Sequence, residues 1–300
     1  MSDPVRRLCL GTAQLGMDYG VANRTGRPGL DEAERIVARA WEAGVRWFDT
    51  AQAYGDSESR LGEVFRRLGI AGEARVVSKL APGLDPGRRA GVRRALDESR
   101  ERLGVESLAA WLLHRSEALD RWESGLGSCV REALASGAIG AFGVSVYRPD
   151  EVLRARGLPE ATAFQCPGNA LDRRFADPAL FPKERMLFYR SVYLQGLLLL
   201  DPEEVGRRLP PGRPAAERLR GHAREARVSL PALLLALSPA TELEGFLVVG
   251  VETEAQMGEN LERIRESASE EVRAAAAAWI ARARDWPLEL IDPSRWKVEP

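Results

Sequence analysis

Short apolar runs recur along the chain, and amphipathic segments with helical spacing separate most of them. Several runs are apolar at both alternating positions, which is typical of parallel strands covered by helices on their outer face. They predict eight strands, at residues 8–10, 46–49, 75–79, 109–114, 141–145, 162–165, 187–190 and 245–249. Eight strands that alternate with helices favour an α/β fold of the closed (β/α)8 TIM-barrel type, with an open doubly wound sheet as the alternative.

The spacing of Leu, Val, Ala and Ile predicts helices at residues 30–43, 57–68, 86–103, 119–136 and 149–156. Asp31 and Ser57 are expected as helix N-caps, and helix-ending glycines are expected at Gly44, Gly69, Gly104 and Gly137. After the seventh strand the pattern predicts a loop at 209–214 and helices at 215–226, from about Ser229, at 254–265 and at 269–284.

Nothing along the chain indicates a second domain, since it has no linker or low-complexity stretch. Residues 1–300 are therefore expected to form one barrel domain with extra C-terminal helices. Residues 286–300, which contain three prolines, are expected to be irregular. Two positions remain open for this tail: over the mouth of the barrel or against its outer surface.

Charge and cysteine content narrow the classes of function. With 43 basic and 44 acidic side chains, the chain has no overall attraction to nucleic acid or anionic membranes. Its three cysteines, without a C-x-x-C pair, do not indicate disulfides or a zinc site, and no metal is expected. No apolar run approaches the roughly 18 to 20 residues of a membrane span. A cytoplasmic protein that acts on a small molecule is expected, and the sequence does not indicate an oligomeric state.

Four polar residues stand where predicted strands end, and this is where barrel enzymes carry their reactive groups. Asp49 ends VRWFD, Tyr54 follows in TAQAYG, Lys79 ends RVVSK and His114 ends AAWLLH. A buried lysine or histidine needs partners, so we expect the four side chains to converge at one mouth of the barrel.

Convergence of these groups predicts proton transfer to a carbonyl. A neighbouring ammonium is expected to lower the pKa of the Tyr54 phenol, which is near 10 in an ordinary tyrosine. Asp49 is expected to pair with Lys79, and His114 to donate a hydrogen bond to the carbonyl oxygen as negative charge develops there. Tyr54 would then be the general acid in reduction and the general base in oxidation.

Longer motifs extend along nearly the whole chain and resemble those of the aldo-keto reductases. In order, they are LGTAQLG, FDTAQAYGDSESRLGE, VVSK, LLH, GAFGVSVY, FQCPGNALDRR, RSVYLQGLL and VVGVETEAQMGENL. The segment D-T-A-x-x-Y-G-x-S-E-x-x-L-G is specific to that family. The resemblance implies that Asp49, Tyr54, Lys79 and His114 form a catalytic tetrad, which the strand ends had also selected. It also implies NAD(P)H-dependent reduction of an aldehyde or ketone, with the nicotinamide dinucleotide bound across the barrel mouth.

The resemblance places cofactor contacts after several strands and on the helix after the eighth. The implied cofactor-binding residues are Gly11, Thr12, Asp49, Ser145, Gln165, Arg190, Ser191, Gly250, Glu252, Gln256 and Asn260. Two departures from the family pattern stand out. Val146 replaces the asparagine that often follows the serine, and Arg190 stands where an aromatic ring often stacks on the nicotinamide. A guanidinium can stack on a planar ring, so Arg190 either takes over this role or leaves that face of the nicotinamide to another group.

The choice between the two nicotinamide cofactors rests on conflicting features. NADP(H) is the cofactor expected from the family, but Glu252 and Gln256 stand where relatives often carry a cation for the 2′-phosphate. A carboxylate repels that phosphate and can accept a hydrogen bond from a 2′-hydroxyl, so NAD(H) or dual use remains open. If Glu252 points outward, backbone amides and Arg263 are the expected contacts of the 2′-phosphate.

Two other functions remain as alternatives. The first is a non-catalytic cofactor-binding regulatory or sensor subunit, because barrels of this family also serve in that way. The second is a metal-dependent or isomerase barrel, which two histidines make a poor fit. The substrate is not identified; its pocket is expected to be formed by residues 14–19, Gln52, Trp111, residues 169–174 and the C-terminal segment.

Overall fold

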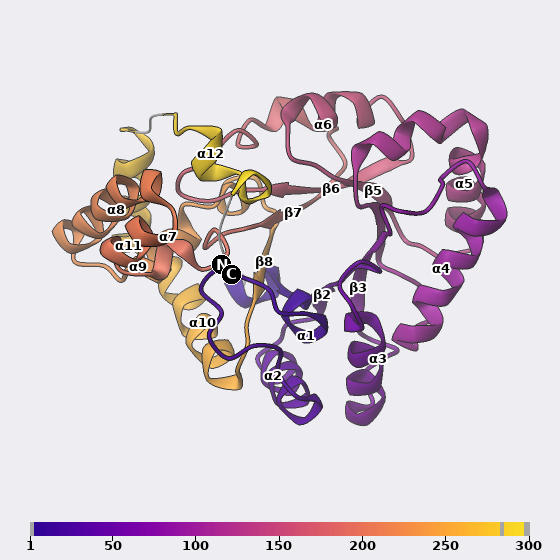
Figure 1. Ribbon diagram of the computed structural model, residues 1–300, viewed down its shortest axis with the longest axis horizontal. Coiled ribbons are helices and arrows are strands. Elements are labelled where there is room, and N and C mark those ends of the chain that lie inside the picture. Colours follow the sequence, from indigo (N-terminus) through magenta and orange to yellow (C-terminus); the bar gives the residue numbers. More distant parts are fainter. Residues whose placement is uncertain (1–2, 283–284, 297–300) are drawn as a thin grey trace.

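Eight parallel strands close into a barrel in the computed structural model, which describes residues 3–282 and 285–296. Each strand pairs with the next along the chain, and β1 closes the barrel against β8 (Figure 1). The strands are β1 (Leu8–Gly11), β2 (Trp47–Asp49), β3 (Arg75–Leu80), β4 (Ala110–Leu113), β5 (Phe142–Ser145), β6 (Ala161–Pro167), β7 (Met186–Arg190) and β8 (Phe246–Gly250). The predicted barrel is confirmed, and the open doubly wound sheet is excluded.

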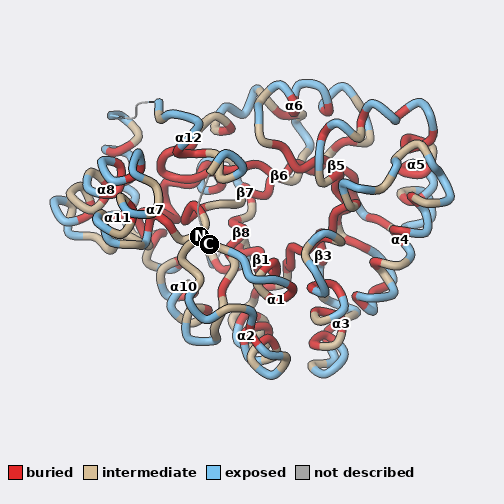
Figure 2. Tube along the Cα trace, in the orientation of Figure 1, coloured by how far each residue is buried: buried red, intermediate tan, exposed pale blue. Residues whose placement is uncertain are grey.

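The period-two alternation of the strands divides the core into two layers. Inward-facing side chains fill the barrel interior, among them Cys9, Trp47, Val77, Ala163 and Phe188. The residues between them face outward and pack under the helices, as Leu8, Leu10 and Phe48 do. Buried chain therefore forms the inner ring in Figure 2, and exposed chain lies on the outer faces of the helices.

Helices surround the barrel, and a further group of helices lies on one side of it. The helices before β7 are α1 (Ala13–Gly16), α2 (Leu30–Glu42), α3 (Ser57–Leu68), α4 (Arg89–Leu103), α5 (Gly127–Ala135) and α6 (Pro149–Ala155). Those after β7 are α7 (Pro202–Arg208), α8 (Arg213–Ala226), α9 (Leu230–Ala236), α10 (Glu254–Ser267), α11 (Glu270–Ile280) and α12 (Leu288–Ile291). Figure 1 shows α7, α8, α9 and α11 gathered beyond α10.

The helix predicted at 119–136 is wrong as a single element. A 3-10 helix (Ser116–Arg121) and a π-helical turn (Trp122–Leu126) precede α5. The break lies at Gly125, whose φ of 149° is not helical. A Cβ at this position would lie 3.0 Å from the carbonyl oxygen of Gly87, so the close approach of the two loops also requires glycine.

Both predicted N-caps are also wrong. Gly29 caps α2 and Asp56 caps α3, so Asp31 and Ser57 lie inside the first turns. Ser57 instead donates from its buried hydroxyl to the carbonyl oxygen of Thr12, at 2.7 Å. Gly69 and Gly104 end their helices as predicted, in the left-handed conformation. The sequence reading missed α7, whose seven residues are too few to show a helical period.

The tail folds back onto the mouth of the barrel. Within residues 286–296 lie α12 and a 3-10 helix (Pro293–Arg295), and Leu290 and Ile291 are buried. Leu288, Asp292 and Arg295 share a hollow with Ser145 and Tyr147, which stand at and just after the end of β5. Of the two positions left open for the tail, the structure therefore shows the one at the mouth. Residues 283–284 of the predicted helix 269–284, and 297–300 of the tail, lie outside the described residues.

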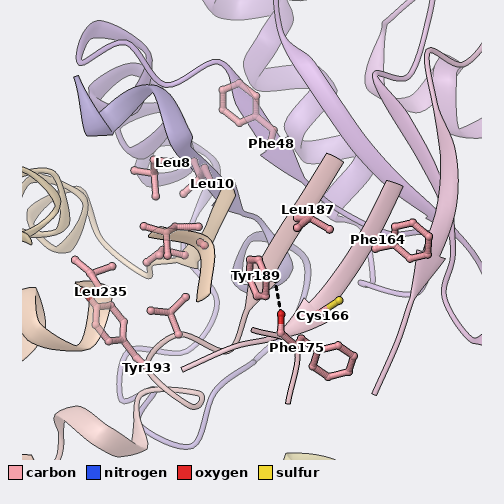
Figure 3. Packing of buried hydrophobic residues seen from close by; sticks show 14 of the residues in the cluster. Leu8, Leu10, Phe48, Phe164, Cys166, Phe175, Leu187, Tyr189, Tyr193 and Leu235 are labelled. Atoms are coloured by element: carbon pink, nitrogen blue, oxygen red, sulfur yellow. Dashed lines mark hydrogen bonds between the residues drawn. The ribbon is translucent and has the colours of Figure 1, made fainter. Parts of the chain in front are cut away.

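The outer core is continuous from the barrel strands to the helices after β7 (Figure 3). Tyr189 faces outward from β7 and donates from its hydroxyl to the carbonyl oxygen of Phe175, at 2.8 Å. This bond fixes the long β6–β7 connection, which carries only a short 3-10 helix (Pro178–Leu180). A buried hydroxyl that finds a partner avoids a desolvation cost of about 1 to 3 kcal/mol.

Candidate active site

The last inward-facing residues of the eight strands form a ring at the mouth of the barrel. In some strands this residue is the final one, and in others it comes just after the strand. Alternation from the apolar inner layer places Asp49 two residues after Trp47, Lys79 after Val77, Gln165 after Ala163 and Arg190 after Phe188. The same count reaches His114 and Ser145, and in β1 and β8 it reaches a glycine at the end of the strand, Gly11 and Gly250. The mouth therefore carries six polar side chains and one gap, where two paired strands both end in glycine.

Asp49 and Lys79 form a buried ion pair at the centre of this ring. The Lys79 ammonium is fully buried and donates to Asp49 Oδ1 at 2.7 Å and to the carbonyl oxygen of Thr50 at 2.8 Å. Asp49 is 4% exposed. Because a buried charge is stable only when it is paired, each side chain holds the other in its ionised form and in one position.

Gln165 binds the same carboxylate oxygen from the opposite side of the barrel. Its amide nitrogen donates to Asp49 Oδ1 at 2.7 Å. Since an ionised carboxylate only accepts hydrogen bonds, the amide oxygen of Gln165 must face away from Asp49. That oxygen is buried and has no partner among the described residues.

Thr12 supports the backbone at Asp49 rather than lining a cavity. Its amide and its hydroxyl both donate to the carbonyl oxygen of Asp49, at 2.9 and 2.8 Å. The Thr12 and Ser57 hydroxyls lie 2.9 Å apart, and Thr50 donates to Ser57 at 3.0 Å. Three hydroxyls thus tie β1, β2 and the start of α3 together beneath the ion pair.

Tyr54 and His114 stand side by side above the Asp49–Lys79 pair. Their ring centroids are 5.8 Å apart in an edge-to-face arrangement, and the Lys79 ammonium lies 4.9 Å from the centroid of the Tyr54 ring. The structure therefore brings together the four residues that the strand ends selected. The site thus combines the ammonium of Lys79, the carboxylate of Asp49, the phenol of Tyr54 and the imidazole of His114.

The pKa of Tyr54 is shifted in the direction opposite to the expected one. Burial raises it above the usual value of a tyrosine, and the Asp49 charge raises it further. The Arg190 guanidinium opposes both effects. The expectation that Lys79 would lower this pKa is wrong in the structure, because Asp49 at 2.7 Å matches the ammonium charge. Tyr54 is consequently a phenol, with its proton in place, throughout the neutral range.

The imidazole of His114 is neutral for related reasons. Burial and the nearby charges of Lys79 and Arg190 lower its pKa from 6.5 to about 4. Its Nδ1 is buried and has no hydrogen-bond partner in the part of the chain that the structure describes. A neutral imidazole has one N–H donor and one acceptor nitrogen, so His114 can still donate to an oxygen beside Tyr54.

We expect His114 to stay neutral down to about pH 5. In NMR titrations of a His222→Gln variant, which leaves one histidine, the His114 ring signals should shift with a midpoint near 4. The unfolded chain takes up this proton near pH 6.5, so the free energy of unfolding should fall as pH drops from 6.5 toward 4. A midpoint above 6 would contradict the burial and charge environment described for this ring.

An elongated cavity of about 330 Å³ extends from Tyr54 to the helix after β8. Asp49, Tyr54 and Arg190 line one end, and the two strand-end glycines, Gly11 and Gly250, line the cavity between the ends. The gap that these glycines leave in the ring of strand ends is therefore part of the lining of this cavity.

Carboxylates line the far end of this cavity. Glu252 accepts from the side-chain amide of Gln256 at 3.1 Å and donates from its backbone to the oxygen of that amide at 2.8 Å. Glu259 and Asn260 from α10 complete this end, and Asn260 accepts from the Tyr193 hydroxyl at 3.1 Å. Arg263 is paired with Glu266 at 2.8 Å and does not line the cavity.

The structure divides the predicted cofactor-binding residues into two groups. One group lines the cavity: Gly11, Asp49, Arg190, Ser191, Gly250, Glu252, Gln256 and Asn260. Thr12, Ser145 and Gln165 are buried outside its lining. His114 lines a neighbouring hollow with Leu80, Leu84 and Arg115.

Two residues expected in the pocket wall lie elsewhere. Trp111 faces outward, because its neighbours in β4 are the inward-facing Ala110 and Leu112. Gln52 donates to the carbonyl oxygen of Ala95 in α4 at 2.7 Å and is held there. In the predicted loop 169–174, the side chain of Arg173 is paired with Glu242 at 2.6 Å.

The sequence reading missed several residues of the site. Tyr147 and Gln195 stand in connecting loops, and Glu259 lies one turn along α10 from Gln256. Tyr147 had a possible signal, since it stands two residues after the inward-facing Ser145. Gln195 had none, because its backbone adopts a left-handed conformation that sequence patterns do not indicate for glutamine.

The part of the chain that the structure describes contains neither a metal-binding cluster nor a membrane-spanning helix. No group of three or more His, Cys, Asp and Glu side chains is arranged there to hold a metal ion. In the same residues, no helix combines the length and apolar character needed to cross a membrane.

Comparison with known proteins agrees with the motifs. The sequence model of the aldo/keto reductase family matches residues 7–280. A D-threo-aldose 1-dehydrogenase from a Pseudomonas species is 27% identical over 295 residues, a match that covers 85% of this chain and 88% of that protein. A 6-dehydroglucose reductase from Novosphingobium aromaticivorans is 29% identical over 133 residues, which make up 40% of this chain and only 43% of that relative's length.

The fold comparison gives the same result. A solved structure from Pseudomonas aeruginosa, assigned to the aldo-keto reductases, superposes with a TM-score of 0.65 at 22% identity, covering 88% of this chain and 91% of that one. At this identity the likeness shows the fold alone. The match to the family's sequence model, by contrast, spans all eight strands and the helix after them. The chain therefore belongs to the aldo-keto reductase family.

Proposed function

We propose that this protein reduces an aldehyde or ketone to an alcohol with a nicotinamide cofactor, and that Tyr54 supplies the proton. The observation that carries the proposal is the convergence of Tyr54, His114 and the buried Asp49–Lys79 pair, of which Tyr54 and Asp49 line one end of the cavity and His114 packs against the Tyr54 ring. Members of the family are oxidoreductases that use nicotinamide cofactors, and the protein is accordingly an oxidoreductase.

The cavity fits the nicotinamide end of such a cofactor. Gly11 and Gly250 contribute no side chains where they pair, and the side-chain amide of Gln14 lies against Gly250, where a Cβ would be 2.3 Å from the amide oxygen. Gly11, Ser191, Gly250, Glu252, Gln256 and Asn260 are the residues we propose to hold the cofactor. Thr12 supports the site from below. When bound, the reduced cofactor supplies the hydride.

The side chains at the catalytic end supply the proton and stabilise the charge that develops on the substrate. Tyr54 holds on its phenol oxygen the proton that is transferred to the carbonyl oxygen of the substrate. His114 donates a hydrogen bond from its N–H to the same oxygen, where negative charge develops. The Asp49–Lys79 pair fixes the position of the ammonium under the Tyr54 ring. Because the raised pKa keeps Tyr54 protonated, the site is prepared for reduction; oxidation of an alcohol would require the phenolate and would become faster at high pH.

The test is single-turnover oxidation of bound NADH or NADPH on addition of a small aldehyde, followed by cofactor absorbance. We expect stoichiometric loss of the reduced cofactor. Tight binding of either cofactor without oxidation by any aldehyde or ketone of a broad panel would contradict the proposal. That result would support the regulatory or sensor role instead.

We further propose that NADH is used at least as well as NADPH. The family favours NADP(H), but in this chain Glu252 and Glu259 line the far end of the cavity and bring negative charge there. Two carboxylates repel a 2′-phosphate, whereas either can accept from a 2′-hydroxyl. The cation considered for the phosphate, Arg263, is occupied by Glu266.

Glu252→Lys should shift the cofactor preference toward NADPH by about tenfold, because it exchanges a repulsive charge for an attractive one. The measurement is the ratio of kcat/KM for the two cofactors with one aldehyde. Glu262→Lys is the matched control, since Glu262 is exposed on α10, the helix that begins two residues after Glu252, and does not line the cavity. Equal ratios in wild type and Glu252→Lys would show that Glu252 does not face the ribose.

A further inference from the structure

Arg190 is the one cation in the lining of the cavity among the described residues. It ends β7 and is half-buried, and its guanidinium is held by two contacts. Nη2 donates to the carbonyl oxygen of Val146 at 3.0 Å, and Cζ lies 4.2 Å from the centroid of the Tyr147 ring. Instead of standing free, the guanidinium is therefore already stacked, on a tyrosine at the end of β5.

The side chains around the catalytic end of the cavity carry more positive than negative charge. Asp49 is matched by Lys79 at 2.7 Å, and His114 is neutral. The titratable groups that interact with Arg190 are the tyrosines Tyr19, Tyr54 and Tyr147 and the thiol of Cys166, and none of them is a carboxylate. Within the described residues, Arg190 has no carboxylate partner. One positive charge is left over at the end of the cavity where the reaction takes place.

Arginines in the adjoining hollow show the contrast. Three of its four arginines, Arg148, Arg174 and Arg295, are each paired with a carboxylate, at 3.2, 2.7 and 3.4 Å, and the fourth, Arg115, is exposed to solvent. A partly buried cation without such a partner is costly, and a guanidinium has five N–H donors, of which Val146 accounts for one. Donors of this kind, aimed into a cavity, match a carboxylate or a phosphate, which accepts two parallel bonds.

We infer that Arg190 recognises an anionic group on the substrate, so that the protein acts on a small carbonyl compound carrying a carboxylate or a phosphate. The inference rests on the proposed reductase function and names its substrate class. Arg190 and Tyr54 line the same cavity, so an anion bound by the guanidinium leaves the carbonyl of a small substrate in the space beside Tyr54, whose ring packs against His114. Arg190 is in this sense a specificity-determining residue.

The experiment compares two matched pairs of substrates with the full-length protein and one cofactor: 4-oxobutanoate with butanal, and glyceraldehyde 3-phosphate with glyceraldehyde. We expect wild type to have a higher kcat/KM for the anionic member of at least one pair, by about tenfold or more. The pair that shows the larger preference identifies the anion as a carboxylate or a phosphate.

The decisive variant is Arg190→Gln, which removes the charge and keeps a donor for the carbonyl oxygen of Val146. We expect the anionic-to-neutral ratio to fall by about 10- to 100-fold, the size of a lost charged hydrogen bond. A change in cofactor binding cancels in this ratio, because both members of a pair react with the same complex. Arg190→Lys should retain part of the preference, and it remains informative should Arg190→Gln fold poorly.

Arg115→Gln is the matched control. Arg115 also follows a barrel strand and borders His114, but it is exposed, lines a different hollow and has no ion-pair partner among the described residues. Its removal should leave the ratio unchanged. Equal ratios in wild type and Arg190→Gln, with neutral aldehydes still reduced, would overturn the inference alone. Failure to reduce any compound of either pair with bound cofactor would instead count against the proposed function.

Discussion

Tyr54→Phe should lower kcat for aldehyde reduction by about 10²- to 10⁴-fold, which is the usual contribution of a positioned general acid. The substitution removes one hydroxyl and keeps the ring that contacts His114 and covers the Lys79 ammonium. Cofactor binding, measured by quenching of protein fluorescence, should stay within about twofold because the floor of the cavity does not change. Turnover near the wild-type value would remove Tyr54 from its assigned role.

Tyr189→Phe provides the matched control for that variant. It removes a hydroxyl of the same kind, but this one faces outward and donates to the carbonyl oxygen of Phe175 at 2.8 Å. We expect it to lower the free energy of unfolding by about 1 to 3 kcal/mol, while kcat stays near wild type. The two variants together separate loss of a proton donor from general loosening of the barrel.

Lys79→Met should destabilise the protein by about 3 to 5 kcal/mol, because it leaves the Asp49 charge buried without its partner. Gln165 still donates to Asp49, but an amide does not compensate a full charge. Urea unfolding followed by circular dichroism gives the free energy. A loss below about 1 kcal/mol would mean that water or another cation reaches Asp49.

The double variant Asp49→Asn, Lys79→Met tests the cause of this loss. Removing both charges should recover most of the stability, since no unpaired charge remains, whereas reductase activity should stay low. Arg66→Met is the control for an ion pair at the surface. Arg66 bonds Glu63 at 2.6 Å but is 71% exposed, so its removal should cost less than about 1 kcal/mol.

The positions of the polar ring could be predicted because strand periodicity is regular. Once a strand is located, its alternation states which residue faces inward, and Asp49, Lys79 and His114 follow from the ends of three apolar runs. The same rule would have placed Trp111 outside the barrel, since Ala110 and Leu112 face inward. That error came from treating an aromatic residue near the site as part of it.

Other features depend on contacts that local patterns do not contain. The rise in the pKa of Tyr54 comes first from burial of its ring and then from the Asp49 charge, and both depend on how distant parts of the chain pack around it. The break in the helix before α5 depends on Gly125 meeting a loop some forty residues earlier. The stacking of Arg190 on Tyr147 joins two strands that are not neighbours in the barrel. Each of these features is set by tertiary structure.

Alternation also restricts how such a protein can change during evolution. Every reactive side chain of the ring stands a fixed, even number of residues beyond the apolar inner layer. Inserting or deleting a single residue inside a strand would turn its terminal side chain from the mouth to the outer surface, and would expose apolar residues at the same time. Changes in length are therefore tolerated only beyond the strand ends. New substrate preferences can arise there by lengthening loops, while the eight strands keep their lengths and the proton-transfer groups keep their places.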